Sequence, residues 1–170
     1  MKLILAAAQL PDCLQVAAVA FDAWESAEAD RTYTTRAPLP QEPAPRGAPD
    51  LRALPTLLQL LHQHALAPEV IVIDGFVDLD PAGTQPGFGR ALFDALQGRA
   101  AVVGLSKSAM KPATPEQFEV HREDETPPLV VTTAGLDLGA AKARVRAMHG
   151  RKRVPTLVKL AARLAKGSGD

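Results

Sequence analysis

Four consecutive apolar residues, Val70 to Ile73, constrain the fold more than any other feature of the sequence. A strand with one face in water alternates apolar and polar residues, whereas this segment is apolar at every position. It is therefore predicted to be an inner, parallel strand of a sheet that helices cover on both faces. Asp74 follows the apolar run directly and is predicted to end the strand.

The flanking segments supply further strands and helices for such a sheet. Apolar runs at 3–8 and 15–21, separated by Pro11-Asp12, predict two strands joined by a turn. The leucines of 54–61 recur at the spacing of an amphipathic helix, for which Asp50 is the expected N-cap. The remaining predicted elements are strands at 31–36, 100–105, 118–122 and 129–133, helices at 86–96, 136–149 and 156–166, and a proline-rich loop at 38–49.

This order of elements predicts one α/β domain with a mixed β-sheet flanked by helices, an order that ribonuclease H-like folds share. A chain of 170 residues fits one domain, which we expect to span 1–166, with a flexible tail at 167–170. The single cysteine, Cys13, and the lack of a secretory leader predict an intracellular, cytoplasmic protein. No apolar run approaches the roughly 20 residues that cross a bilayer, so no membrane insertion is expected.

Positive charge gathers towards the C-terminal end, although the formal net charge is zero. Nine basic residues and no acid occupy 142–166, a distribution that favours an anionic partner. The densest part predicts a nucleic-acid-binding surface that contacts phosphates without reading sequence. A solvated helix surface and a site for an acidic protein are the alternatives. The residues are Arg144, Arg146, Arg151, Lys152 and Arg153, with Lys159, Arg163 and Lys166 following them.

Three motifs resemble segments of the endonuclease V family and occur in the same order. They are Val70-Ile71-Val72-Ile73-Asp74-Gly75, Gly104-Leu105-Ser106-Lys107-Ser108, and Arg153-Val154-Pro155 with the helix after it. Looser similarity extends over nearly the whole chain. The resemblance implies a ribonuclease H-like, endonuclease V-like fold and a metal-dependent activity that nicks DNA or RNA near deaminated purines. It also implies that Asp74 binds Mg²⁺ or Mn²⁺ and that Lys107 lies beside the active site.

Several positions that carry the chemistry of that family hold other residues here. The resemblance places Ala8 where the first metal-binding aspartate of the family stands, and Ala53 where its glutamate stands. Phe76 replaces a histidine, a late histidine has no counterpart within 133–136, and the loop at 43–47 lacks the wedge tyrosine. Because one carboxylate seldom holds a catalytic Mg²⁺, the resemblance implies that cleavage is impaired or lost.

Four other aspartates could complete a metal site with Asp74. Asp78 and Asp80 stand in the loop that follows it, Asp22 ends the second predicted strand, and Asp137 precedes a predicted helix. Carboxylate oxygens are the ligands that Mg²⁺ prefers. Each of the four is equally suited to a surface or N-cap position.

The sequence supports three hypotheses about function. The first is a nucleic-acid-binding protein with an endonuclease V-like fold and little or no nuclease activity, a pseudonuclease. The second is an active Mg²⁺-dependent endonuclease that nicks inosine-containing DNA or RNA in repair and uses a rearranged carboxylate site. The third is a scaffold or regulatory domain whose partner is a protein rather than a nucleic acid.

Overall fold

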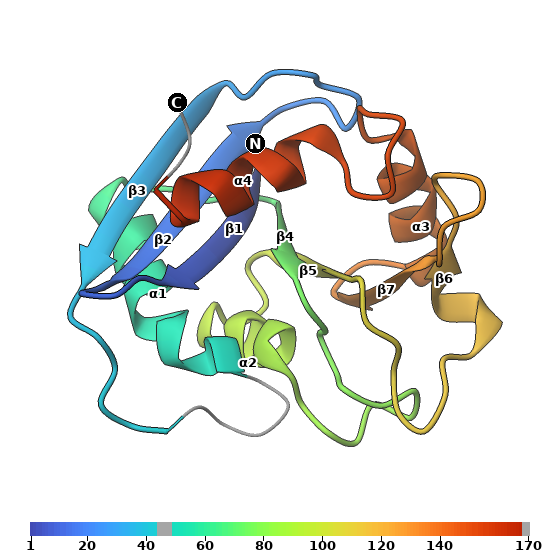
Figure 1. Cartoon of the computed structure of the whole chain (residues 1–170), viewed down its shortest axis with the longest axis horizontal. Helices are drawn as coiled ribbons and strands as arrows, with labels where there is room; N and C mark the ends of the chain where they lie inside the picture. Colours follow the sequence, from blue (N-terminus) through green and yellow to red (C-terminus); the bar gives the residue numbers. More distant parts are fainter. Residues whose placement is uncertain (44–48, 168–170) are drawn as a thin grey trace.

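A seven-stranded mixed sheet organises the chain (Figure 1). The computed structural model describes residues 1–43 and 49–167. The wedge-loop residues 44–47 and most of the expected tail, 168–170, therefore lie outside the described residues. The strand order is β3-β2-β1-β4-β5-β7-β6. The strands are β1 (Lys2–Gln9), β2 (Leu14–Phe21), β3 (Arg31–Ala37), β4 (Val70–Asp74), β5 (Ala101–Ser106), β6 (Glu119–Val120) and β7 (Leu129–Ala134).

Helices cover both faces of this sheet, as the sequence predicts (Figure 1). Helices α1 (Leu54–Gln63) and α2 (Phe88–Ala95) pack on one face and share one cluster of buried side chains with it. Helices α3 (Leu138–Ala147) and α4 (Thr156–Ala165) pack on the other face and share a second cluster. Two short 3₁₀ helices, η1 (Pro49–Ala53) and η2 (Glu116–Phe118), lie in connecting segments.

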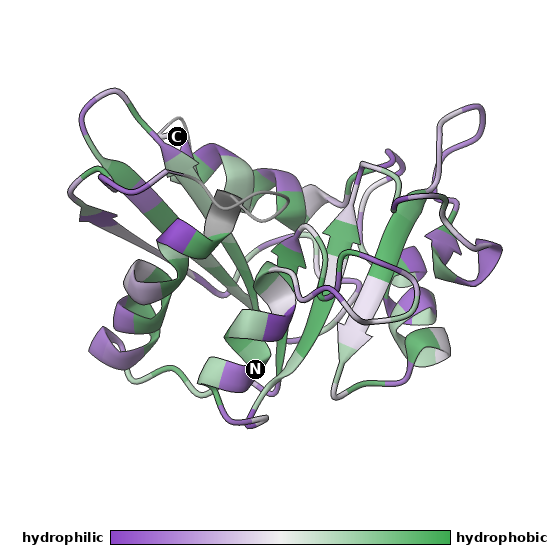
Figure 2. Cartoon of the chain, turned by 90° about the horizontal axis from the view of Figure 1, so that it is seen from below, coloured by the Kyte–Doolittle hydropathy of each residue, from purple (hydrophilic) through white to green (hydrophobic). Residues whose placement is uncertain are grey.

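Strand β4 occupies the middle of the sheet, parallel to β1 on one side and to β5 on the other. Ile71 and Ile73 belong to the core beneath α1 and α2, whereas Val72 belongs to the core beneath α3 and α4. All three side chains are at most 1% exposed, so each contributes about 1.5–3 kcal/mol of hydrophobic stabilisation. The prediction of a doubly covered parallel strand is confirmed. Figure 2 shows the apolar colour along the strands in the middle of the sheet, whereas the connecting segments are a mixture of hydrophilic and hydrophobic residues.

The chain leaves β4 by crossing closely over β5. Gly75, at a φ of +133°, donates its N–H to the Leu105 carbonyl at 2.8 Å. Val77 then donates its N–H to the Thr132 hydroxyl of β7 at 2.9 Å. A Cβ atom at Gly104, beneath the crossing, would lie only 2.5 Å from the Gly75 carbonyl oxygen. The crossing therefore needs glycine at 104, and it ends β4 at Asp74.

The early end of β4 leaves part of β1 without a neighbour on that side. The two strands pair only from Lys2 to Leu5 of β1, although β1 continues to Gln9. A crevice therefore opens at the carboxyl ends of the parallel strands. In open α/β sheets such a crevice is a frequent place for ligands to bind.

Among the boundaries that the tertiary structure moves are those of α1, α2 and β6. α1 begins after the η1 turn, and its N-cap position is Ala53 rather than Asp50, because Pro55 is suited to the first helical turn. Pro86 lies outside α2, since the adjacent Gly87 donates its N–H to Val77 and holds the segment extended. The strand predicted at 118–122 shortens to the two residues of β6.

None of the helices in the described part of the chain combines the length and the apolarity needed to cross a bilayer.

The hydroxyl of Thr132 gives a test of the crossing. Thr132→Val removes the acceptor of the buried Val77 N–H, and an unsatisfied buried donor costs about 1–3 kcal/mol. We expect urea unfolding to show a loss of stability of that size. Thr133→Val, on the next residue of β7, is the control and should change stability by less than about 0.5 kcal/mol. Equal losses in the two variants would contradict the role of this hydrogen bond.

Candidate functional site

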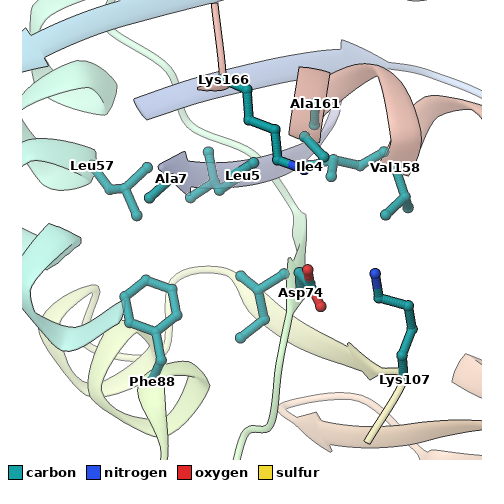
Figure 3. A pocket seen from close by; sticks show the side chains of 13 residues that line it. Ile4, Leu5, Ala7, Leu57, Asp74, Phe88, Lys107, Val158, Ala161 and Lys166 are labelled. Atoms are coloured by element: carbon teal, nitrogen blue, oxygen red, sulfur yellow. The ribbon is translucent and has the colours of Figure 1, made fainter. Parts of the chain in front are cut away.

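Three charged side chains meet at the crevice beneath α4. Asp74 is the exposed last residue of β4, Lys107 follows the end of β5, and Lys166 is the C-cap residue of α4. Figure 3 shows Asp74 beside Lys107, which rises from the end of β5, and below Lys166, which descends from α4. The three side chains line the same two cavities. The resemblance pointed to Asp74 and Lys107, and the structure places both of them, with Lys166, at this crevice.

The two cavities adjoin and differ in character. The inner one, of about 200 Å³, lies between helices of both sheet faces, and Leu57 and Phe88 form its apolar wall on the α1 and α2 side. The outer one, of about 330 Å³, lies between α4 and the end of β5. Its apolar lining is Leu105, Leu129, Val154, Pro155, Val158 and Ala162. Lys159 and Arg163 line only the outer cavity.

The packing of α4 explains why its cations face the outer cavity. Leu157, Ala161 and Ala165 recur every four residues and are buried against the sheet. Residues three and four apart share a helix face. Lys159, Arg163 and Lys166 follow that spacing on the neighbouring face, which borders the cleft. With Lys107, four basic side chains line the outer cavity, and within 1–43 and 49–167 the one carboxylate that lines it is that of Asp74.

The register of β1 shows which residue stands beside Asp74. Leu5 pairs with Ile73, so the next step of the register places Ala6 opposite Asp74. Side chains two apart on a strand point to the same face of the sheet, so Asp74 shares the face of Val72, beneath α3 and α4. Ala6 packs with the core on that same face. Ala6, rather than Ala8, is therefore the β1 neighbour of Asp74. The methyl group offers no metal ligand and leaves open space.

Ala8 and Ala53, which the resemblance places at the metal-ligand positions of the family, lie close to each other but outside the cavities of Asp74. Ala8 and Ala53 line a separate cavity of about 70 Å³. There Arg52 donates from Nη2 to the side-chain oxygen of Gln9 at 2.9 Å. The α1 residue that reaches the cavity of Asp74 is Leu57. Neither strand β1 nor helix α1 brings an acid to Asp74.

Two of the four auxiliary aspartates lie at the other end of the strands. Asp22 follows β2, which pairs with β1 so that Phe21 is opposite Lys2, and the Lys2 ammonium donates to the Asp22 carbonyl oxygen. Asp137 is the N-cap of α3, and its carboxylate accepts the Ala140 N–H at 2.9 Å. Strand β2 runs antiparallel to β1, and β7 runs antiparallel to β5, so both strands end at the sheet edge opposite to Asp74. Asp22 and Asp137 therefore do not complete a metal site with Asp74, contrary to the prediction.

The other two are held within the loop that follows β4. Arg90 donates to Asp78 at 2.9 Å, and this hydrogen bond raises the pKa of Arg90. Asp80 accepts hydrogen bonds from the hydroxyl of Thr84 and from the N–H of Gln85, and the Thr84 bond lowers the pKa of Asp80. Neither aspartate lines the cavities of Asp74. Their carboxylates are used by local hydrogen bonds, so the structure corrects this expectation also.

The donor set at Asp74 does not fit a divalent metal. Within 1–43 and 49–167, no group of three or more His, Cys, Asp or Glu side chains is placed to hold a metal ion. Mg²⁺ and Mn²⁺ take oxygen ligands. Here one carboxylate stands with the ammonium groups of Lys107 and Lys166, which have no lone pair to donate while protonated.

The predicted basic cluster is dispersed in the structure. Arg153 donates from Nη2 to the carbonyls of Lys107 at 2.9 Å and Pro128 at 3.0 Å. It therefore holds the segment of Lys107 in place. Lys152 lies 3.8 Å from the Glu123 carboxylate. Arg144, Arg146 and Arg151 are exposed outside the cleft, and Arg146 borders another cavity with Glu116 and Glu119.

Arg122 is a structural residue that the pattern of the sequence did not reveal. It donates to the carbonyls of Val145, Met148, Gly150 and Lys152, where α3 ends and the basic loop begins. Burial lowers the pKa of its guanidinium. Carbonyls at a helix C-terminus lack intrahelical donors, and Arg122 supplies them. No local signal in the sequence links position 122 to this distant helix end.

A mixed sheet in this strand order, with helices on both faces and a crevice at the end of its central strand, defines a ribonuclease H-like α/β fold. Solved structures of endonuclease V have the same fold, and this chain is therefore endonuclease V-like in structure. Human ENDOV matches with a TM-score of 0.75 at 18% sequence identity, over 98% of this chain and 82% of that chain. No family model and no curated protein matches the sequence.

Two further structures extend the likeness. Ciona intestinalis endonuclease V, in complex with a 24mer DNA containing an inosine followed by a ribo-adenosine, matches with a TM-score of 0.73 at 14% identity. That match covers 98% of this chain and 84% of the other. Bacillus subtilis endonuclease V matches with a TM-score of 0.68 at 15% identity, over 94% of this chain and 76% of the other. At these identities the likeness concerns the fold.

The hydrogen bonds of Arg153 can be tested against the neighbouring arginine. Arg153→Met removes the hydrogen bonds that one charged nitrogen, Nη2, donates to the carbonyls of Lys107 and Pro128, and a hydrogen bond from a charged group contributes about 1.5–3 kcal/mol. We expect chemical unfolding to show a loss in the range of about 1.5–3 kcal/mol. Arg151→Met, at an exposed position, should stay within about 0.5 kcal/mol of the parent protein. A stability loss confined to Arg151→Met would contradict this assignment.

Proposed function

We propose that this chain is a nucleic-acid-binding protein of endonuclease V-like fold that holds the phosphates of a DNA or RNA strand in the cleft beneath α4. We propose also that its nuclease activity is largely or wholly lost. The observation that carries the first part is the set of four basic side chains, Lys107, Lys159, Arg163 and Lys166, along one cleft. Clusters of this kind bind nucleic acid through phosphate contacts and counterion release.

The shape and lining of the cleft support this proposal. An apolar floor formed by Leu105, Leu129 and Val158 lies beside the cationic rim. A nucleotide has an apolar base and sugar surface next to a charged phosphate, so such a cleft complements it. The Ciona structure shows that a protein of this fold can bind DNA.

The carboxylates support the loss of cleavage. Catalysis by metal-dependent nucleases relies on ions that clamp the attacking and leaving oxygens. Among the residues that the structure describes, Asp74 is the one acid that lines the cavities of this site, and none of the four auxiliary aspartates joins it. The sequence also has no tyrosine within 43–47, where the resemblance places the wedge tyrosine of the family. We therefore propose binding without cutting and without preference for inosine.

Binding can be tested by the fluorescence anisotropy of a labelled single-stranded oligonucleotide. Removing Lys107 and Lys159 together, as Lys107→Gln with Lys159→Gln, should weaken binding at least tenfold. The slope of log affinity against log salt should become shallower by about 1.4, at about 0.7 for each lost phosphate contact on a single strand.

Arg99→Gln with Arg31→Gln is the matched control, since it removes two positive charges from positions that line none of the cavities. It should change affinity less than twofold. Equal losses in the two double variants would place binding outside the cleft. An absence of salt-sensitive binding to single- and double-stranded probes would favour the scaffold hypothesis instead.

Cleavage can be tested with labelled inosine-containing and unmodified strands in Mg²⁺ or Mn²⁺. We expect no nicking above background, and affinities for the two strands within twofold of each other, because the cleft offers contacts to phosphates rather than to one base. Asp74→Ala is the companion variant. Nicking by the parent protein that disappears in Asp74→Ala would establish an active nuclease and refute the loss of activity.

A further inference from the structure

We infer that the cavity at Asp74 binds a phosphate group directly, with the ammonium groups of Lys107 and Lys166 taking the place of a divalent cation. This inference rests on the proposed function, because the phosphate is that of a bound nucleic-acid strand. It goes further in naming the charges that neutralise the phosphate. It also states that binding requires no metal ion.

The position of Lys166 carries the first part of the argument. Lys166 comes from the C-terminal end of α4, far in sequence from the strands, yet its side chain lines both the inner and the outer cavity. Figure 3 shows it reaching down towards the space beside Asp74. Ala6 and Ala7 of β1 border the inner cavity with methyl groups. The ammonium therefore extends into the cavity beside Asp74, where the β1 residue in register with Asp74 is Ala6.

The balance of charge carries the second part. Within the inner cavity, one carboxylate stands with two ammonium groups, and no ion pair among the described residues joins them within 4.0 Å. A divalent cation placed here would gain one carboxylate ligand and would be repelled by both lysines. An anion instead neutralises the excess positive charge. The site therefore selects an anion over a metal.

The chemistry of lysine suits a phosphate, which is the anion that the proposed nucleic-acid ligand supplies. Each ammonium offers three N–H donors on a flexible stem, and lysine is a common point-charge ligand of phosphate oxygens. The separate stems of Lys107 and Lys166 approach from β5 and α4, so a tetrahedral group can accept hydrogen bonds from both. Asp74 would then lie close to the phosphate and repel it. Removing the charge of Asp74 should consequently strengthen binding, the reverse of what a metal-binding aspartate predicts.

The experiment measures the anisotropy of the same single-stranded oligonucleotide in EDTA and in Mg²⁺ at equal ionic strength, with the full chain. Affinity in EDTA should equal that in Mg²⁺ within twofold. Lys166→Gln should weaken binding at least fivefold in EDTA, and Asp74→Asn should strengthen it at least twofold. Arg99→Gln, which loses one charge outside the cavities, should leave it unchanged. Thermal unfolding confirms that each variant is folded.

The outcomes separate this inference from the proposed function. Binding that requires Mg²⁺ and disappears in Asp74→Asn would overturn the inference and leave the proposed function standing. Equal affinities of Lys166→Gln and Arg99→Gln in EDTA would also overturn it, since Lys166 would then contribute no phosphate contact. An absence of binding under both conditions would overturn the inference and the proposed function together.

Discussion

The close crossing of the chain over β5 is the constraint on which the rest of the structure depends. The Gly75 carbonyl lies so near Gly104 that a Cβ atom there would approach it to 2.5 Å. The N–H groups of Gly75 and Val77 are paired across the crossing to Leu105 and Thr132. These contacts end β4 while β1 continues. The crevice, its exposed Asp74 and the position of Lys107 beside it all follow from that early end.

Helix α4 turns this crevice into a charged cleft. Its small and apolar residues Leu157, Ala161 and Ala165 lie against the sheet, and the neighbouring face then carries Lys159, Arg163 and Lys166 to the edge of the crevice. One amphipathic pattern therefore has two consequences. It buries the helix on β1 and β2, and it places a row of cations opposite the end of β5. Stability and the proposed phosphate binding share the same helix.

The polar residues illustrate why a site is harder to predict than a fold. Asp78, Asp80 and Asp137 are close enough in sequence or pattern to suggest a metal site, but each carboxylate is already used by a local ion pair, turn or helix cap. Arg153 is similarly used to hold the Lys107 carbonyl. Short polar side chains have several local partners available. Residue type alone does not tell which of these competing partners a given side chain takes.

The sequence by itself determined the sheet and its layers. Val70 to Ile73 could be stable only when buried on both faces, and the three- and four-residue spacing of the leucines at 54–61 predicted an amphipathic helix to cover them. The layers depend on the burial of local patterns, which the sequence reports directly. Asp74 and Lys107 became candidates through the family resemblance, because the strand pattern alone suits each of them equally to a turn or surface position.

Only the tertiary structure decided what accompanies Asp74. Strand register placed Ala6 beside it, the antiparallel course of β2 and β7 carried Asp22 and Asp137 to the other end of the strands, and the packing of α4 brought Lys166 from the end of the chain. Register and helix packing bring together residues far apart in sequence. Charge at such a meeting point is therefore a property of the fold, and here it is positive.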